Sequence, residues 1–72
     1  MLNRHVLAAR LSTERVRLDL TQTELATRVG TYQSHISELE RADAVYTPSI
    51  DLVLRLATVL GVKVEWLLGE GS

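Results

Sequence analysis

The 72-residue chain contains no cysteine and no phenylalanine, and it has one tryptophan and one proline. The lack of cysteine excludes a disulfide framework and a thiolate metal site. Stability must therefore come from packed aliphatic side chains, which are abundant, or from a partner subunit. A chain of this length is near the lower limit of what folds without cross-links. We treat residues 1–72 as a single domain with its core at about 3–69.

Long apolar runs are also missing from the sequence. No segment approaches the ~20 consecutive apolar residues of a membrane span. The N-terminal segment MLNRHVLAARL lacks the longer apolar run and the cleavage site of a signal peptide. These absences predict a soluble, cytoplasmic protein with no membrane partner.

The strong positive charge that usually marks a nucleic-acid binder is absent, because the net charge is −1. Residues 1–42 carry six arginines against five acidic residues, and residues 43–72 carry two basic against four acidic residues. The basic excess lies in the first part of the chain but is small. Charge alone therefore does not indicate DNA binding.

The sequence also lacks the residue combinations of an enzyme. His5 and His35 are the only histidines, and no carboxylate pair, nucleophile constellation or metal-ligand spacing accompanies them. We therefore expect no catalytic activity, no metal and no cofactor.

What the chain does have is a pair of helix signatures that meet at a glycine. Thr21 and Glu24 have the spacing of a capping box, in which each side chain accepts a backbone N–H from the other residue. Leu20 and Leu25 have the spacing of a hydrophobic staple, and Gly30 is typical of a left-handed helix end. A second helix begins almost at once. This arrangement predicts a helix-turn-helix.

Apolar residues at helical spacing predict three further helices, so the chain is expected to be all-α. The predicted helices run from a cap at Asn3 to about 17 or 18, and over about 22–29, 32–41, 48–60 and 64–68. The first is expected to bury Leu7, Ala8, Leu11 and Leu18. The loop at 42–47 separates the third helix from the fourth, and the tail at 70–72 is expected to fray.

The fourth predicted helix is apolar on two faces. Thr47 is expected to cap it, with Pro48 at its first position and Gly61 at its end. A helix with two apolar faces is buried on more than one side or contacts a partner. One face carries Ile50, Val53, Leu54, Ala57 and Leu60, and the other carries Leu52, Leu56 and Val59.

The third predicted helix has a polar face opposite Ile36 and Leu39. Glutamine can pair with the adenine edge, serine can donate or accept, and arginine reaches guanine or phosphate. Glutamate can only accept, typically from the cytosine amino group, and it repels phosphate. An ordinary solvated face is the alternative, but the place of this helix in a helix-turn-helix favours base recognition. The face consists of Gln33, Ser34, Ser37, Glu38 and Arg41.

Three polar residues elsewhere have specific interpretations. Gln22 stands at the N-terminus of the second helix, where free N–H groups favour anions, so its amide can add a donor to a DNA phosphate. The alternative is that Gln22 is only a good helix former. Arg15 and Glu40 each fall on the apolar stripe of a helix, which predicts a largely buried ion pair. Removing one partner of such a pair costs ~3–5 kcal/mol.

Three segments together resemble the Xre family of helix-turn-helix proteins, which includes the Cro proteins and the DNA-binding domains of phage repressors. LTQTELATRVG is similar to the family's LTQ-x-ELA-x-x-x-G, and ISELER to IS-x-x-E-R/N. PSIDLVLRLATVLGVKVEWLLGE is similar to P-S-x-x-x-L-x-x-LA-x-x-LGV-x-x-x-WLL. The match covers about residues 10–69. It implies a compact, five-helix, lambda-repressor-like domain that places its third helix in the major groove of DNA.

The resemblance also implies roles for individual residues. Base contacts are expected from Gln33, Ser34 and Glu38, with Ser37 on the same face, and phosphate contacts from Gln22 together with Thr21, Tyr32 and Arg41. Arg15 and Glu40 match a buried ion pair of phage-repressor relatives. Family members usually bind pseudo-palindromic DNA as homodimers. The contacts here correspond to Val62, Val64 and Trp66 and to the exposed side of the fourth helix. For Trp66, capping the core is an equal alternative.

Two departures from the family pattern affect these expectations. Tyr32 stands where a serine or threonine usually caps the third helix, so Thr31 is expected to cap it instead. The glycine that commonly follows this helix is replaced by Ala42–Asp43–Ala44. With Glu38 and the acidic net charge, the sequence predicts weak non-specific affinity for DNA.

The sequence thus predicts a sequence-specific transcriptional regulator, most simply a repressor. The alternative is a protein-interaction module, such as an antitoxin, in which the same fold holds another protein. The negative net charge and the second apolar face of the fourth helix support that alternative.

Overall fold

The computed structural model describes residues 3–41, 43 and 47–69. They form α1 (Arg4–Arg17), α2 (Gln22–Val29), α3 (Gln33–Leu39), α4 (Ile50–Leu60) and α5 (Val64–Leu67). These residues contain no strand, and the prediction of an all-α, five-helix fold is confirmed. In the described part of the chain, no helix has the length and apolarity needed to cross a membrane. Most of the predicted loop at 42–47 and the predicted frayed tail at 70–72 lie outside the described residues.

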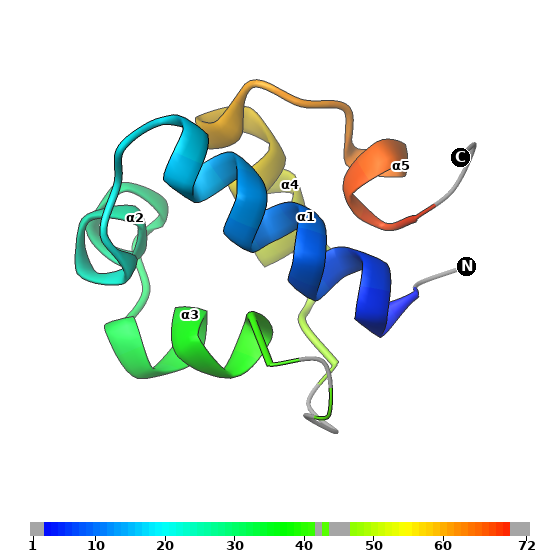
Figure 1. The fold of residues 1–72 in the computed structure, drawn as a ribbon, viewed down its shortest axis with the longest axis horizontal. Coiled ribbons are helices and arrows are strands. Elements are labelled where there is room, and N and C mark those ends of the chain that lie inside the picture. Colours follow the sequence, from blue (N-terminus) through cyan, green and yellow to red (C-terminus); the bar gives the residue numbers. More distant parts are fainter. Residues whose placement is uncertain (1–2, 42, 44–46, 70–72) are drawn as a thin grey trace.

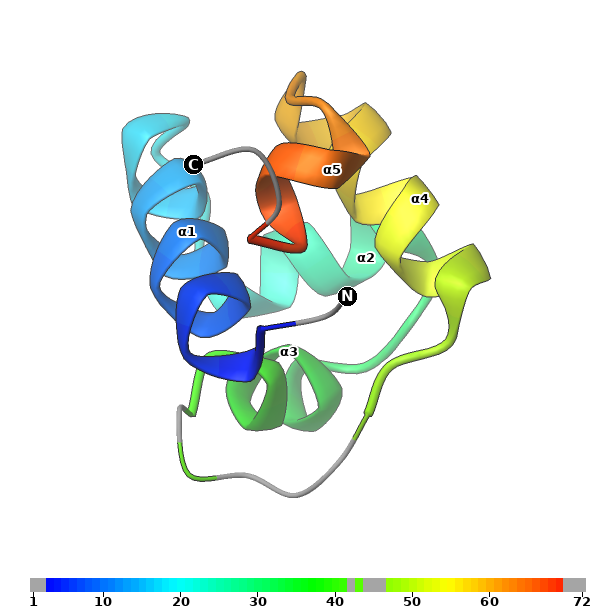
Figure 2. The same ribbon diagram turned by 90° about the vertical axis from the view of Figure 1, so that its right-hand side faces the viewer.

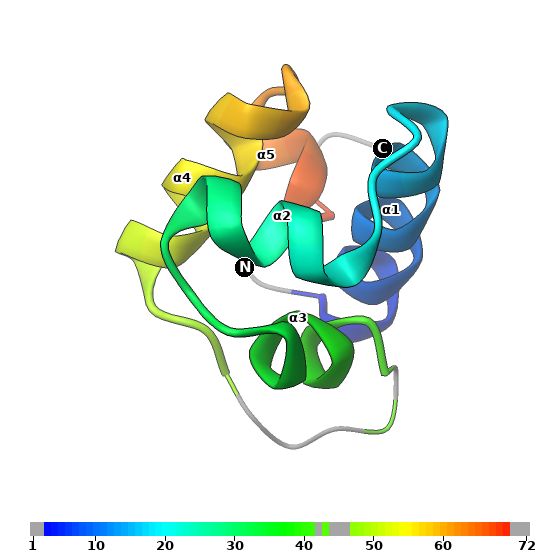
Figure 3. The ribbon, with the colours of Figure 1, turned by 90° about the vertical axis from the view of Figure 1, so that its left-hand side faces the viewer.

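The helices surround one apolar core. Figure 1 shows α1 running across the molecule in front of α4, with α2 to one side of them and α3 below. Figures 2 and 3 show α5 on the opposite side of the molecule from α3. The buried cluster draws on all five helices and consists of Leu7, Leu11, Leu20, Leu25, Ala26, Val29, Ile36, Leu39, Leu52, Val53, Leu56, Ala57, Leu60 and Leu67.

The first helix begins as the sequence predicts. The side chain of Asn3 accepts the backbone N–H of Val6 at 3.1 Å and caps α1. Leu7, Ala8 and Leu11 are buried, but Leu18 is 36% exposed. The expectation that Leu18 is buried is wrong, because α1 ends at Arg17 and Leu18 follows it as the C-cap.

The second helix has both predicted caps. Thr21 and Glu24 form the capping box, with Thr21 Oγ1 accepting the Glu24 N–H at 3.0 Å and Glu24 Oε1 accepting the Thr21 N–H at 2.9 Å. Gly30 ends α2 in the left-handed region, at a φ of 80° that disfavours residues with a Cβ. Leu20 and Leu25 are both buried in the core. Local sequence therefore defines this helix at both ends.

The third helix differs from its prediction at the N-terminus. Tyr32 is the N-cap, in extended conformation, and its side chain makes no capping hydrogen bond. The expectation that Thr31 caps α3 is wrong, because its hydroxyl lies 2.7 Å from Nδ1 of His35. Glu40 is the C-cap, and Arg41 N–H bonds the Glu38 carbonyl, which tightens the last turn. Regular helix therefore covers 33–39 rather than 32–41.

The fourth helix begins later than predicted. Ser49 caps it by accepting the Leu52 N–H at 3.2 Å, so Thr47 is not the cap and Pro48 is not the first helical residue. Pro48 is instead buried in the segment that precedes the helix. Ser49 caps the helix in place of Thr47 because α4 begins at Ile50. The N–H of Leu52, three residues after Ser49, then has no partner within the helix and is bound by the Ser49 hydroxyl.

The buried stripe of α4 is also narrower than predicted. Ile50 is 62% exposed and Leu54 is 47% exposed, so the alternative in which both faces are buried within the fold is wrong for these two residues, and contact with a partner stays a prediction. The stripe is centred between the two predicted faces, which places these two residues at its outer edge. It consists of Leu52, Val53, Leu56, Ala57 and Leu60, with Val59 partly buried beside it.

The end of α5 lies against the start of α1. The Asn3 N–H bonds the Leu68 carbonyl at 2.9 Å. Gly69 follows at a φ of 91°, and a Cβ there would lie 2.9 Å from the Cβ of Asn3. Glycine is therefore required at this close approach. The contact ties the first described residues to the last ones.

Candidate nucleic-acid interface

The polar face predicted on the third helix faces outward in the fold. We call it the outer face of α3; Gln33, Ser34 and Arg41 are exposed on it, and Ser37 and Glu38 are half-buried. Together with Tyr32 and His35, these residues line a surface hollow of about 520 Å³. The opposite side of α3 buries Ile36 and Leu39 in the core. α3 thus packs through its apolar side and presents a polar surface to solvent.

A chain of side-chain hydrogen bonds connects this face to α2 and α1. Gln33 Nε2 donates to Gln22 Oε1 at 2.7 Å, and Gln22 Nε2 donates to Glu40 Oε1 at 3.2 Å. With one N–H of Gln33 engaged, its amide oxygen and second N–H remain available to a base edge. An oxygen beside a free N–H is the pattern that pairs with adenine N6 and N7.

Glu40 is held from the other side by Arg15. Arg15 Nε donates to Glu40 Oε2 at 2.6 Å and Nη2 donates to Oε1 at 3.1 Å, while Nη1 donates to the Leu20 carbonyl at 2.7 Å. The two side chains are 15% and 8% exposed. The hydrogen bond to Glu40 raises the pKa of Arg15 although burial opposes the charge. This largely buried ion pair links α1 to the end of α3.

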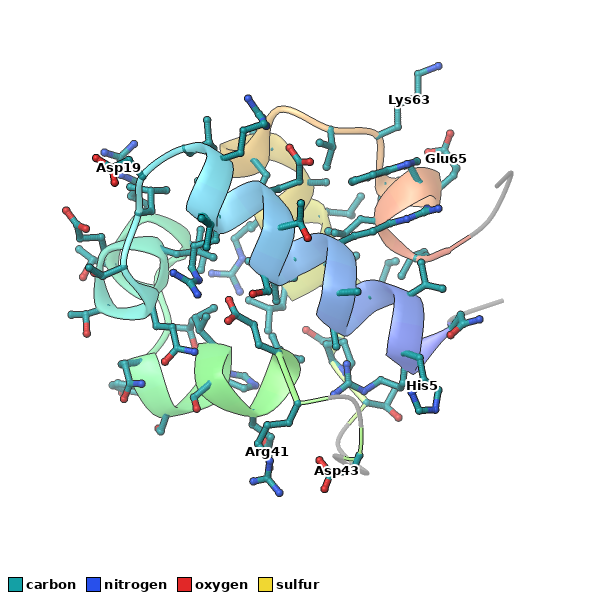
Figure 4. All side chains as sticks on the ribbon, in the orientation of Figure 1. His5, Asp19, Arg41, Asp43, Lys63 and Glu65 are labelled. Atoms are coloured by element: carbon teal, nitrogen blue, oxygen red, sulfur yellow. The ribbon has the colours of Figure 1, made fainter. Side chains whose placement is uncertain are left out.

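The residues assigned to phosphate contacts lie near α3, but some of their side chains already have partners within the protein. Thr21 uses its hydroxyl as an acceptor in the capping box, and its backbone N–H, which donates to the Glu24 carboxylate, is the main cause that lowers the pKa of Glu24. Tyr32 is 79% exposed. Arg41 projects away from the protein with Asp43 beside it, and its Nε lies 3.6 Å from the Asp43 carboxylate (Figure 4). Arg41 must therefore leave Asp43 to contact a phosphate fully.

The positive charges of the chain are mostly committed within the fold. Five of its seven arginines donate to backbone carbonyls of another segment, and four of these five arginines do so at the C-terminal end of a helix. A helix C-terminus carries partial negative charge, so a guanidinium there is stabilising. The five are Arg4, Arg10, Arg15, Arg17 and Arg55. These hydrogen bonds hold five guanidinium groups in place within the fold, and the nine acidic residues of the chain balance its positive charge.

The residues assigned to a dimer contact lie around α5, on the other side of the molecule. Val62 and Val64 are partly buried and pack against the core. Trp66 is half-buried, its ring centroid lies 4.5 Å from the Arg10 guanidinium carbon, and its carbonyl accepts from Arg10. Figure 4 shows the neighbouring Lys63 and Glu65 far from Arg41. The two candidate surfaces therefore do not overlap.

One residue that contacts α3 was missed by the sequence reasoning. Arg4 lies in the first turn of α1 and donates to three carbonyls at the end of α3. Its partners are more than thirty residues away, so no local pattern could have identified it. Within the described residues, no group of three or more histidine or acidic side chains could hold a metal ion.

The fold and the sequence both match known helix-turn-helix proteins. A family model described as "Helix-turn-helix", of the Xre and Cro type, matches residues 11–67. The chain is 38% identical over 56 residues to an uncharacterized HTH-type transcriptional regulator of Archaeoglobus fulgidus, covering 78% of this chain and 76% of that protein. It is also similar to the crystal structure of a hypothetical transcription factor, NHTF, from Neisseria. That match has a TM-score of 0.82 and 30% identity and covers 92% of this chain and 74% of the other.

Proposed function

Because this chain belongs to the helix-turn-helix family of the Xre and Cro type, we propose that it binds double-stranded DNA sequence-specifically and regulates transcription. The family is a non-enzymatic class of DNA-binding regulators. In the proposed complex, α3 enters the major groove and the N-terminus of α2 crosses the DNA backbone. We place the protein in the cytoplasm for this role.

The observation that carries the proposal is the hydrogen bond between Gln22 and Gln33. It joins the residue proposed to hold a phosphate to the residue proposed to read a base, at 2.7 Å. A phosphate contact fixes the register of a protein on the duplex, and a base contact supplies specificity. Coupling the two side chains favours one orientation of Gln33 before DNA arrives. Preorganisation of this kind reduces the entropy lost on binding.

The remaining base contacts are assigned to the outer face of α3. Ser34 and Ser37 offer hydroxyl groups that donate or accept, and Glu38 accepts from the amino group of cytosine. Thr21, Gln22, Tyr32 and Arg41 are assigned to phosphates. Because Glu38 and Asp43 add negative charge near the duplex, non-specific affinity is expected to be weak.

We further propose that two copies bind a pseudo-palindromic site. A dimer formed through α5, with Val62, Val64 and Trp66 at the contact, would leave both α3 helices free, since α5 and α3 lie on opposite sides of the molecule (Figure 2). A domain seated in the major groove excludes other proteins from the same base pairs. Repression of an overlapping promoter is therefore the simplest regulatory outcome.

The proposal is tested by selection from random duplexes at low salt. The native protein should enrich one sequence, with half-sites about 34–36 Å apart if it binds as a dimer. Gln33→Ala should reduce affinity for the enriched duplex by roughly tenfold, because a good base contact is worth about 1–3 kcal/mol. Thr13→Ala, at an exposed position of α1, is the matched control and should leave affinity unchanged. Failure to enrich any duplex would refute DNA recognition.

Salt dependence provides a second measurement on the same duplex. The logarithm of the binding constant should fall with the logarithm of salt concentration, with a slope of about −0.9 for each phosphate neutralised. Because most arginines are committed within the fold, we expect this slope to be shallow. A steep slope would contradict the assignment of those arginines to structural roles.

A protein-interaction module is the second candidate function, and one observation favours it. Ile50 and Leu54 are exposed on α4, and Leu54 borders a hollow of about 230 Å³ shared with Arg28 and Arg55. Two exposed aliphatic side chains make only a small apolar surface. Single exposed apolar residues are common on protein surfaces that bind no partner. Co-purification with a stable protein partner, abolished by Leu54→Ser and accompanied by no duplex binding, would favour this candidate.

A further inference from the structure

The last turn of α3 has no cation of its own, and Arg41, which follows the C-cap, has its guanidinium beside the Asp43 carboxylate. Glu38 and Glu40 place negative charge near this end of the helix. Helix C-termini carry unpaired carbonyl groups and partial negative charge, so acidic residues there are unfavourable. α3 also lacks a side-chain cap at its N-terminus. Its two ends must therefore be stabilised by groups from other parts of the chain.

Arg4 supplies the missing cation. Its Nη1 donates to the Leu39 carbonyl at 3.2 Å, and its Nη2 donates to the carbonyls of Glu38 at 3.4 Å and Arg41 at 3.2 Å. Figures 1 and 2 show the first turn of α1 beside the end of α3. The planar guanidinium matches this arrangement because it presents several N–H groups in a fixed fork. Among the described residues, Arg4 Nε is buried and has no hydrogen-bond partner.

The two ends of α3 are attached to different helices. The N-terminal end follows the turn at Gly30 and is linked to α2 through Gln22 and Gln33. The C-terminal end is linked to α1 through Arg4 and through the ion pair at Glu40. An α-helix rises about 1.5 Å per residue, so α3 is short and moves as a rigid rod. If one end of α3 is fixed, a small rotation about that end displaces the other end.

We propose that Arg4 is a positioning residue for DNA recognition. Its guanidinium fixes the C-terminal end of α3 and thereby the base contacts made by Ser37 and Glu38. Gln33, at the other end, is held independently. Arg4 acts through backbone carbonyls of α3 rather than on a base. This inference rests on the proposed function, since α3 must read DNA for its position to matter.

Three variants separate this role from a general loss of charge or stability. Arg4→Met removes the guanidinium but keeps an unbranched apolar stem. Arg17→Met is the matched control, because Arg17 also lies in α1 and donates to a helix-end carbonyl, that of Leu60 in α4 at 3.4 Å. Both variants lower the net charge by one. Arg4→Lys keeps the charge but cannot present the same fork of donors.

The first readout is amide hydrogen exchange of the free protein, followed residue by residue by NMR. Arg4→Met should accelerate exchange over residues 36–41 by about tenfold, because hydrogen bonds from a charged donor are lost at that end. Exchange over residues 22–29 should not change. Arg17→Met should leave residues 36–41 unchanged, and Arg4→Lys should fall between the native protein and Arg4→Met.

The second readout is base preference on the duplex enriched by the native protein. The Glu38→Gln variant identifies the base pairs that depend on Glu38. At those base pairs, Arg4→Met should discriminate between the preferred and the other bases about tenfold less than the native protein. It should keep its discrimination at the base pairs altered by Gln33→Ala. Arg4→Lys should recover part of the loss. A merely structural role for Arg4 would instead weaken binding evenly at all base pairs.

The proposal is overturned if Arg4→Met and Arg17→Met change exchange over residues 36–41 equally, or if Arg4→Met weakens binding evenly at all base pairs. If the methionine variant does not fold, the same two measurements on Arg4→Lys decide the question. If the native protein enriches no duplex, the proposed function fails. The exchange comparison then decides separately whether Arg4 fixes the end of α3.

Discussion

The two helices of the helix-turn-helix are stabilised in opposite ways. α2 has a complete capping box at its N-terminus and a left-handed glycine at its C-terminus, with Arg28 in its last turn. α3 has no side-chain cap and no basic residue in its last turn. It is held from outside instead, through its buried residues, the ion pair between Arg15 and Glu40, and the guanidinium of Arg4.

The difference follows from what each helix has to do. A helix that uses side chains for its own caps commits those side chains to itself. Because α3 obtains its support from α1 and α2, the side chains of its outer face remain available to a partner. Its position also depends on contacts that are distant in sequence. The helix proposed to read DNA is therefore the one whose placement the rest of the fold controls.

The largest effect is expected where α3 is joined to α1. Arg15→Met leaves Glu40 largely buried without its charged partner, which should reduce the free energy of unfolding by ~3–5 kcal/mol. Chemical denaturation measures the loss. The double variant Arg15→Met with Glu40→Leu should recover most of it, because no charge is then left unpaired. If Arg15→Met loses less than about 1 kcal/mol, this ion pair contributes no more than an ordinary surface ion pair, which would contradict the prediction.

A smaller effect is expected at the N-terminus of α2. Thr21→Ala removes the hydroxyl that accepts the Glu24 N–H, and it should lower the free energy of unfolding by about 1 kcal/mol. Thr13→Ala, in the exposed part of α1, serves as the control. An unchanged unfolding free energy in Thr21→Ala would mean that the capping box does not stabilise α2.

Adding a cap to α3 should have a still smaller effect in the opposite direction. Tyr32 occupies the N-cap position with a φ of −111° and a ψ of 153°, which suits a capping side chain. Tyr32→Ser should raise the free energy of unfolding by roughly 0.5 kcal/mol. The same variant should weaken duplex binding if Tyr32 contacts a phosphate. A decrease in stability would show that the aromatic ring contributes more than a cap would.

The smallest effect concerns acid pH. Since hydrogen bonds from the backbone N–H of Thr21, and then from its side chain, lower the pKa of Glu24, ionised Glu24 stabilises the folded state above its unfolded pKa of about 4.5. This contribution is lost as the pH falls through the lowered, folded-state pKa. Glu24→Gln keeps an amide oxygen for the cap but does not titrate, so its unfolding free energy should depend less on pH below about 4. Equal acid sensitivity of the two proteins would contradict this assignment.

The sequence predicted most accurately what depends on neighbouring residues. The limits of α2 and the cap of α1 at Asn3 were correct, because the capping residues lie within three positions of the groups they bind. Arg15 and Glu40 could be paired from sequence because each interrupts an apolar stripe. A charged residue within an apolar stripe indicates that a residue of opposite charge, far away in the sequence, lies beside it in the fold.

What the sequence did not reveal depends on how the helices pack. Ile50 and Leu54 have the spacing of core residues, but the orientation of α4 leaves them exposed. Ser49 rather than Thr47 caps α4, since both have suitable side chains and only the backbone path selects between them. The contact between Arg4 and the end of α3 spans about half the chain and had no local sign.

The most direct test of this account is a map of backbone amide resonances during titration with the enriched duplex. If α3 reads DNA and α2 contacts the backbone, the largest shifts should fall on Gln22, Gln33, Ser34, Ser37 and Glu38. The resonances of Ile50 and Leu54 on α4 should change little. Shifts centred on α4, with the outer face of α3 unaffected, would contradict the account.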